Sequence, residues 1–186
     1  PKLWEHYLQE QETCHDSKVS SVSFRDKRSG WKTYSVTFNF ENGDSVSRIL
    51  TEDAYMKAFL SHVALRPACH ECSFKQIHRK SDITLADFWG AEKLCPEKND
   101  NKGISLVLCH SERGARLFAA VKDEMDVWPV NFEEAIKDNL SMVKSSPASR
   151  LRPMFMAKLG KTRVFRLVDK YCGSGLASRA RRLIAK

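Results

Sequence analysis

The sequence lacks any long apolar stretch. None of its 186 residues belongs to a run of 18 uncharged apolar residues, which excludes a conventional membrane-spanning helix. The first residues, PKLWEHYLQEQE, lack the basic start and apolar core of a secretion signal. We therefore expect a cytoplasmic protein. Because the chain opens on Pro1 instead of methionine, we also expect a processed product or an excised segment, with part of the protein missing upstream.

Cysteine is sparse as well. Six cysteines are scattered over the chain, which excludes the dense pattern of a small secreted disulfide framework and favours reduced thiols. We interpret Cys14, Cys109 and Cys172 as small, partly buried hydrophobic side chains. Only Cys69 and Cys72, separated by two residues, stand out as a pair.

Acidic residues are nearly absent from the C-terminal end. Residues 149–186 carry 11 Lys and Arg and one acid, a net charge of +10, whereas residues 1–148 hold 20 basic and 22 acidic residues, a net charge of −2. A nucleic-acid-binding domain usually spreads its basic residues over a folded face, so nucleic acid is the least favoured partner. The basic tail is typical of a solvated helical face, of peripheral membrane contact or of docking on an acidic partner, and the sequence does not choose among these.

Hydrophobic periodicity predicts the elements of the first half. Apolar residues at helical spacing after Pro1 predict a helix over residues 2–12. Three runs of alternating apolar and polar residues, separated by the turns DKRSG and ENGD, predict an antiparallel meander. Thr51, followed by two acids, is expected to be the N-cap of a helix over residues 52–63.

In the second half, Ile83, Leu85 and Phe88 predict a short strand that ends at Gly90, and the nearly continuous apolar run ISLVLC is typical of a central strand covered on both faces. A helix is expected over residues 111–124, with Leu117, Phe118 and Val121 facing inward, and residues 126–130 are expected to return as a strand. Further helices are predicted in FEEAIKDNL and at residues 150–158, 161–171 and 176–185.

These elements predict an α+β fold in which a mixed β-sheet with an N-terminal antiparallel meander is flanked by helices and followed by a helical C-terminal tail. We expect one domain over residues 1–146 and a basic helical tail over residues 147–186, with the linker SMVKSSPAS between them.

The segment over residues 66–90, RPACHECSFKQIHRKSDITLADFWG, concentrates the residues that could carry chemistry. Two thiols separated by two residues can bind one metal ion or one edge of an iron–sulfur cluster, but either site needs further ligands. Within the chain, His70, His78 and Cys95 are the nearest candidates for completing a zinc site. A thioredoxin-type redox pair and simple packing remain open, although Pro67 before the pair disfavours the redox pair.

The run SDITLADFWG ends this segment. Asp82 and Asp87 bracket the predicted strand, and an acid at a strand end that closes on glycine can hydrogen-bond to a ring or a ribose while an aromatic side chain packs on its face. The plainer interpretation is equally open at this point: Asp82 caps the turn before the strand, and Trp89 belongs to the core.

Three motifs in order, CHECSF, SDITLADFWG and NKGISLVL, resemble the C-terminal domain of the coenzyme F-420 hydrogenase/dehydrogenase beta subunit family. The resemblance covers residues 1 to about 130. It implies flavin-dependent electron transfer, in which a [4Fe–4S] cluster passes electrons to FAD and the flavin exchanges hydride with coenzyme F-420 or another acceptor. Such chemistry requires no catalytic acid or base, and we interpret His62 and His110 as incidental polar residues.

The resemblance also implies which residues form the site. Cys69 and Cys72 match cluster-ligand positions. The positions expected near the cofactor are Asp82, Thr84, Asp87, Trp89, Gly90, Lys102 and Ser105, the last two from a Lys-Gly-x-Ser element. A lysine beside a glycine suits a phosphate or a flavin ring, because the bare backbone allows close approach and the ammonium group offsets negative charge.

Two residues depart from the family pattern, Ser81 where alanine is usual and Ala86 where many members have glycine; both are small, and we expect them to be tolerated. In the family, the other cluster cysteines and often a ferredoxin-like domain precede this stretch. We therefore expect an upstream domain or a separate redox partner protein to complete the site, and this chain to be inactive alone. The predicted function is an iron–sulfur flavoprotein oxidoreductase, and the alternative is a zinc-stapled, non-enzymatic interaction module.

Overall fold

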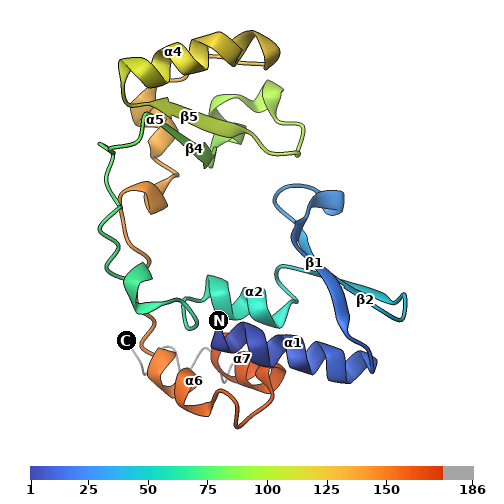
Figure 1. Ribbon diagram of the computed structural model, residues 1–186. Helices are drawn as coiled ribbons and strands as arrows, with labels where there is room; N and C mark the ends of the chain where they lie inside the picture. Colours follow the sequence, from blue (N-terminus) through green and yellow to red (C-terminus); the bar gives the residue numbers. More distant parts are fainter. Residues whose placement is uncertain (174–186) are drawn as a thin grey trace. The chain divides into compact units, whose positions relative to one another are not determined.

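The structure, a computed structural model, describes residues 1–173 and consists of two compact units (Figure 1). The first unit combines Pro1–His70 with the described residues from Pro147 onward, and the second unit is Glu71–Ser146. The first unit is thus built from two separate stretches of sequence. The predicted helix over residues 176–185 lies outside the described residues. The assignment of residues 1–146 to a domain and residues 147–186 to a tail stays a prediction.

The first unit contains an antiparallel meander, as predicted. β1 pairs with β2 and β2 pairs with β3, so that Phe38 in the central strand lies opposite Val22 on one side and Val46 on the other. The α+β class is confirmed as well. The elements of this unit are α1 (Lys2–His15), β1 (Val19–Asp26), β2 (Ser35–Phe40), β3 (Ser45–Ile49), α2 (Ala54–Leu60), α6 (Arg152–Lys158) and α7 (Val164–Cys172).

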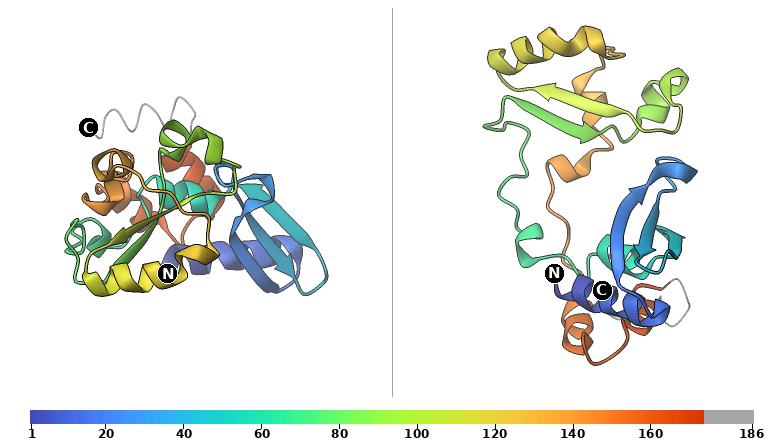
Figure 2. Two further views of the ribbon diagram at one scale, coloured as in Figure 1. Left: turned by 90° about the horizontal axis from the view of Figure 1, so that it is seen from above. Right: turned by 45° about the vertical axis from the view of Figure 1, so that its right-hand side comes forward.

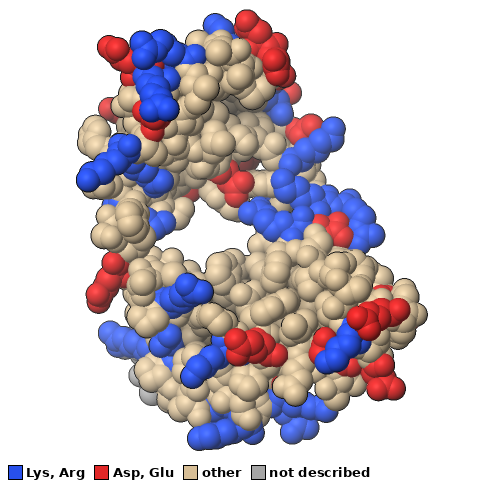
Figure 3. All heavy atoms as spheres, viewed as in Figure 1, with Lys and Arg blue, Asp and Glu red and all other residues tan. Residues whose placement is uncertain are grey.

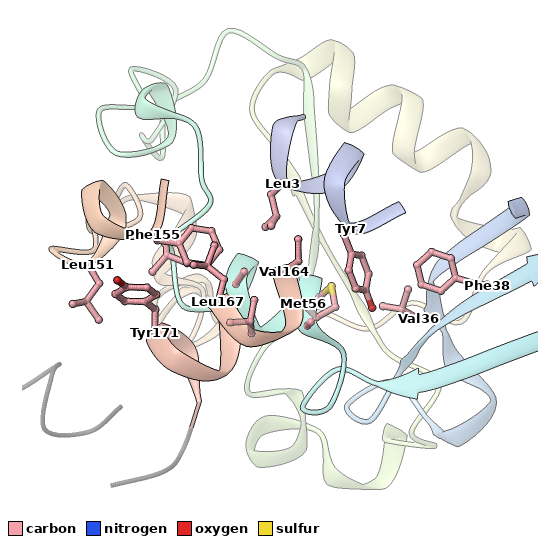
Figure 4. Packing of buried hydrophobic residues seen from close by; sticks show 14 of the residues in the cluster. Leu3, Tyr7, Val36, Phe38, Met56, Leu151, Phe155, Val164, Leu167 and Tyr171 are labelled. Atoms are coloured by element: carbon pink, nitrogen blue, oxygen red, sulfur yellow. The ribbon is translucent and has the colours of Figure 1, made fainter. Parts of the chain in front are cut away.

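The C-terminal helices belong to the core of this unit. α7 contacts both α1 and α2, and it lies beside them in the views of Figure 1 and Figure 2. The core residues labelled in Figure 4 are Leu3, Tyr7, Val36, Phe38, Met56, Leu151, Phe155, Val164, Leu167 and Tyr171. The buried apolar side chains of α6 and α7 therefore pack with those of the N-terminal elements, and such burial is the main source of helix stability in proteins.

A buried carboxylate connects two of these helices. Asp53 is fully buried, accepts the Tyr7 hydroxyl at 2.5 Å and caps α2 by accepting the backbone N–H of Met56 at 2.9 Å. The prediction that Thr51 caps this helix is wrong, because α2 begins at Ala54 and its N-cap is Asp53. Burial, reinforced by the nearby charge of Asp53, raises the pKa of Tyr7 far above its ordinary value.

The second unit contains a separate two-stranded sheet. β4 and β5 pair antiparallel, so the expected single mixed sheet is replaced by two antiparallel sheets. The physical reason is that the connection between β4 and β5 returns the chain directly alongside β4, whereas a parallel pair needs a crossover to the far end. The elements are β4 (Ile83–Asp87), α3 (Ala91–Leu94), β5 (Ser105–Cys109), α4 (Glu112–Val121) and α5 (Phe132–Ile136).

The core of the second unit is small. Its buried apolar residues are Phe88, Ala91, Cys95, Leu106 and Ala135. β5 was expected to be covered on both faces, but in a two-stranded sheet only Leu106 of this strand is buried. The prediction that Leu117 and Val121 of α4 face inward is wrong. Among the described residues, their side chains are 60% and 41% exposed. Residues 126–130 form no strand.

Gly114 explains why α4 presents so little apolar surface to the sheet. A Cβ at this position would lie 2.2 Å from the carbonyl oxygen of Asp82, so the helix backbone itself packs against the start of β4. The hydroxyl of Ser111 caps α4 by accepting the backbone N–H of Gly114 at 3.0 Å. The close approach is made by backbone, and therefore only a glycine fits here.

Candidate functional site

The two paired cysteines lie on either side of the boundary between the units. Cys69 ends a 3₁₀ turn, Pro67–Cys69, in which its backbone N–H donates to the Arg66 carbonyl at 2.9 Å. The backbone N–H of Cys72 donates to the Ser145 hydroxyl at 2.9 Å. Both thiols are half-buried and free of disulfides. Each unit thus carries one thiol of the pair that the sequence predicts to bind a metal.

Further metal ligands are not gathered around either thiol. Within residues 1–173, no three His, Cys, Asp or Glu side chains form a group that could hold a metal ion. Cys95, a candidate third ligand for zinc, is buried in the small core, where its sulfur accepts the indole N–H of Trp128 at 3.0 Å. This thiol is therefore occupied by packing and a hydrogen bond.

The remaining three cysteines serve no common site. Cys172 is half-buried, as expected, and its sulfur accepts the Ser61 hydroxyl at 3.2 Å. Cys14 and Cys109 are exposed, which corrects the expectation that they are partly buried. They lie in α1 and at the end of β5, where their side chains face away from the apolar clusters.

The register of β4 and β5 divides the predicted cofactor residues into two groups. Asp87 lies opposite Ser105 at one end of the pair, and Ile83 lies opposite Cys109 at the other. At about 3.3 Å per residue, the two ends are about 13 Å apart. Successive side chains also point to opposite faces, so the buried Thr84 and the exposed Asp87 face different sides of the sheet. The seven residues do not converge on one point.

At the first end, Asp82 and Thr84 organise the junction with α4. The carboxylate of Asp82 accepts the Ser111 hydroxyl at 2.5 Å, and its backbone carbonyl accepts the N–H of His110 at 2.8 Å. The hydroxyl of Thr84 lies 2.8 Å from Nε2 of His110. His110, interpreted from the sequence as incidental, thus connects the two strands, and the capping interpretation of Asp82 fits these contacts.

At the other end, the predicted residues are more exposed. Trp89 is 42% exposed, so it does not belong to the core, and Asp87 and Ser105 face solvent. Gly90 has φ 91°, a conformation that favours glycine, and a Cβ there would lie 2.5 Å from Oδ2 of Asp138. This glycine is therefore required by the local backbone even without a ligand.

Lys102 and its neighbours form a tight turn before β5. The backbone N–H of Lys102 donates to Oδ1 of Asp100 at 2.9 Å, and its ammonium lies 3.3 Å from Oδ2 of the same carboxylate. These hydrogen bonds hold the pKa of Asp100 below its ordinary value, the backbone one contributing most. The turn thus leads directly to Ser105 and places a lysine near the Asp87 end of the sheet.

A groove of about 530 Å³ in the second unit was not predicted from the sequence. It is lined by Ile77, His78, Arg79, Val107, Leu108, Cys109, His110 and Phe132. None of the seven predicted cofactor residues lines it. Its walls come from residues far apart in sequence, so no local motif predicts it. The sequence signal that it does offer is the adjacent pair Cys109 and His110 at the end of the apolar run of β5.

The structure describes the basic residues of the C-terminal segment up to Lys170. On the face drawn in Figure 3, Lys and Arg side chains are intermixed with Asp and Glu. Among the described C-terminal residues, Lys161, Arg163 and Arg166 lie in the turn before α7 and in its first turn. Within residues 1–173, no helix has both the length and the apolar character needed to cross a membrane.

Comparison with protein families identifies the chain's relatives. Residues 1–134 match the family described as the C terminus of the Coenzyme F420 hydrogenase/dehydrogenase beta subunit. The chain belongs to this family. The match includes both paired cysteines and all seven residues predicted near the cofactor, and it confirms the resemblance found in the sequence motifs. No curated protein and no solved structure matches the chain.

Membership in the coenzyme F420 hydrogenase/dehydrogenase beta subunit family indicates an oxidoreductase-related role. Such proteins generally work with redox cofactors, and the fit of this chain to each group can be judged from its residues. For an iron–sulfur cluster, the two paired cysteines supply too few ligands. For a flavin, the exposed Asp87 end of the β4–β5 pair offers polar side chains, an aromatic ring and glycine backbone near one strand end in the sequence.

Proposed function

We propose that this chain is part of an iron–sulfur flavoprotein oxidoreductase that passes electrons between a [4Fe–4S] cluster, FAD and a deazaflavin-like or other acceptor. The observation that carries the proposal is the family match over residues 1–134. The bound flavin would supply hydride and electron transfer, while the protein positions it and excludes solvent. The electron donor and acceptor follow from neither the match nor the fold.

Cys69 and Cys72 are proposed as cluster ligands that require others from outside the chain. The remaining four cysteines form no group with them, and residues 174–186 contain no cysteine or histidine. The missing ligands would therefore come from a ferredoxin-like domain or a redox partner protein. A two-cysteine contribution is consistent with a four-ligand cluster shared between two modules.

The flavin contact is proposed for the Asp87 end of the β4–β5 sheet. Asp87, Trp89, Gly90, Lys102 and Ser105 offer a carboxylate, a half-exposed ring, bare backbone, an ammonium group and a hydroxyl around one strand end. Asp82 and Thr84 are proposed to act at a distance, by fixing α4 against β4 through Ser111 and His110. In this proposal they position the sheet without touching the ring.

Location and further contacts are also proposals. We propose that the protein works in the cytoplasm and that its basic C-terminal residues contact an acidic partner or a membrane surface. Nucleic acid is not proposed, because the excess of basic over acidic residues is confined to the C-terminal segment.

The test is anaerobic purification of the chain together with its redox partner or ferredoxin-like domain, followed by iron, sulfide and flavin analysis. We expect iron with acid-labile sulfide and bound flavin in the natural protein, and loss of iron in the Cys69→Ser/Cys72→Ser variant. A Cys14→Ser/Cys109→Ser variant, which removes two exposed thiols elsewhere, is the matched control and should keep the iron. Full iron content in the first variant would contradict the proposal.

The same analysis decides the alternative of a zinc-stapled interaction module. Stoichiometric zinc without sulfide or flavin would favour it.

A further inference from the structure

A pocket in the first unit lies between α1 and the turn that leads into α7. It has a volume of about 620 Å³, within the range of small-molecule sites. One wall is the face of α1 that carries His6, Glu10 and Cys14, at helical spacing. The opposite wall is the segment from Gly160 to Arg166, and Arg48, from β3, also lines the pocket.

The approach of the two walls depends on Gly160. Its φ is 80°, a conformation that favours glycine, and a Cβ on this residue would lie 3.1 Å from the imidazole of His6. A larger residue would therefore push the turn away from α1. The pocket is thus built by the local backbone of the chain.

Positive charge converges on this pocket. Arg48, Lys161, Arg163 and Arg166 line it with two acids, Glu10 and Glu52, so its charged side chains sum to +2. Glu10 is already engaged, because its carboxylate accepts the backbone N–H of Val164 at 2.6 Å at the start of α7. The N-terminus of α7 is thus already occupied by a carboxylate, and the attraction for a further anion comes from the cations that line the pocket.

Most of these cations are not neutralised within the chain. Arg48 donates to the neutral Oε1 of Gln11 at 2.8 Å. Among the described residues, the side chains of Lys161, Arg163 and Arg166 form no ion pair. Three like charges within six residues around a concave surface repel one another and focus positive potential into it. A multivalent anion would relieve this repulsion.

We propose that this pocket binds a small molecule bearing a phosphate or pyrophosphate group. Arginine guanidinium groups form two parallel hydrogen bonds with phosphate oxygens, and the higher charge and larger number of oxygens of pyrophosphate suit several adjacent cations better than a single carboxylate does. The exposed ring of Phe165 and the edge of Tyr7 also line the pocket, so an organic part of the ligand has apolar surface to contact.

The proposal goes beyond the redox function and does not depend on it. Three of the four cations lie after residue 134, outside the range of the family match. None of the residues proposed to bind a cluster or flavin lines the pocket. Loss of phosphate binding would therefore leave the redox proposal standing, and the reverse holds as well.

The test is isothermal titration calorimetry of the 186-residue chain with inorganic pyrophosphate at low ionic strength. We expect saturable binding of one pyrophosphate per chain and weaker binding of succinate, a dicarboxylate of similar charge sign. The Arg163→Ala/Arg166→Ala variant should bind pyrophosphate about tenfold more weakly or worse, because charged hydrogen bonds are lost. Lys158→Ala/Lys144→Ala, which removes two exposed cations outside the pocket, should stay within about twofold.

A variant with the opposite effect guards against loss of folding. Glu52→Gln removes an exposed negative charge from the pocket lining and should tighten pyrophosphate binding. Circular dichroism should show unchanged folding for all variants. The proposal is overturned if the natural chain shows no saturable binding, if the pocket and control variants lose affinity equally, or if succinate binds as tightly as pyrophosphate.

Discussion

Asp53 illustrates how a single residue connects local and tertiary structure in the first unit. A carboxylate removed from water is costly unless its oxygens are well hydrogen-bonded. Here one oxygen caps α2 and the other accepts the Tyr7 hydroxyl from α1. The same side chain therefore fixes where α2 starts and how α2 sits against α1, which makes it a sensitive position for stability.

We expect Asp53→Ala to lower the free energy of unfolding by about 3 kcal/mol, because it removes a helix cap and leaves the Tyr7 hydroxyl unpaired in the core. Urea denaturation followed by circular dichroism measures this change. Glu52→Ala, at the exposed neighbouring position, is the matched control and should change stability by less than about 0.5 kcal/mol. Similar losses in both variants would exclude a special role for the buried carboxylate.

Tyr7 also predicts how stability depends on alkaline pH. Its pKa is raised in the folded protein, by burial first and by Asp53 second, so the folded state keeps the phenolic proton more tightly than the unfolded chain does. The stabilising contribution is therefore complete below the unfolded pKa of about 10 and is lost as pH rises above it. Thermal unfolding between neutral and alkaline pH should show this decline, and Tyr7→Phe should reduce it. An equal decline in Tyr7→Phe would assign the effect to other groups.

At the scale of elements, α7 shows how a basic segment can still be a core helix. Its buried residues are Val164, Leu167, Val168 and Tyr171, whereas Phe165 between them is 65% exposed. These four buried side chains recur at helical spacing and form one apolar stripe, and Arg166 and Lys170 are exposed. A helix with basic residues can thus bury its apolar face, because its long charged side chains remain in water.

Leu167→Ala should destabilise the protein by about 3 kcal/mol, the usual cost of a cavity at a buried leucine. Phe165→Ala on the same helix removes a larger but exposed side chain and should cost less than about 1 kcal/mol. Chemical denaturation of both variants tests the pair. Equal costs would mean that α7 does not dock as described.

Local signals predicted most elements of the first unit but failed in parts of the second. The alternation around Phe38 and the turns beside it specify the meander directly, because strand period and turn chemistry agree. The run ISLVLC was misjudged because an apolar run does not say how many strands lie beside it. Leu117 and Val121 were placed inward by helical periodicity, but the approach of the Gly114 backbone to Asp82 decides which side of α4 meets the sheet.

The candidate site was predictable only as a set of motifs. The family could be identified from the residues around Cys69 and Asp87, and the comparison confirms it. That Asp82 and Asp87 belong to opposite ends of one strand pair could be anticipated from the strand itself, but the hydrogen bond between Asp82 and Ser111 and the ion pair between Lys93 and Asp138 could not. Such contacts depend on register and loop paths, which a single sequence does not encode locally.

At the scale of the whole molecule, the two units differ in the size of their cores. Sixteen buried apolar residues form the main cluster of the first unit, but only five form that of the second. Because stability scales with buried apolar surface, the second unit should open at a lower free energy. A cofactor or partner that binds the folded second unit would stabilise it.

Native-state hydrogen exchange should resolve this difference. For amides of the β4–β5 pair, we expect a free energy of opening at least about 2 kcal/mol lower than for amides of the β1–β2 pair. Adding low concentrations of urea should expose the second unit first. A single common free energy for both sheets would show that the two units unfold as one.

The discontinuity of the first unit also matters while the chain is being made. Residues 1–70 must remain without Phe155, Leu167 and the rest of α6 and α7 until synthesis has passed the second unit. The hydrogen bond from the backbone N–H of Cys72 to the Ser145 hydroxyl joins the beginning of the second unit to its end. The second unit can thus form on the ribosome before the first, so the part of the chain translated earliest is the last to acquire its native partners.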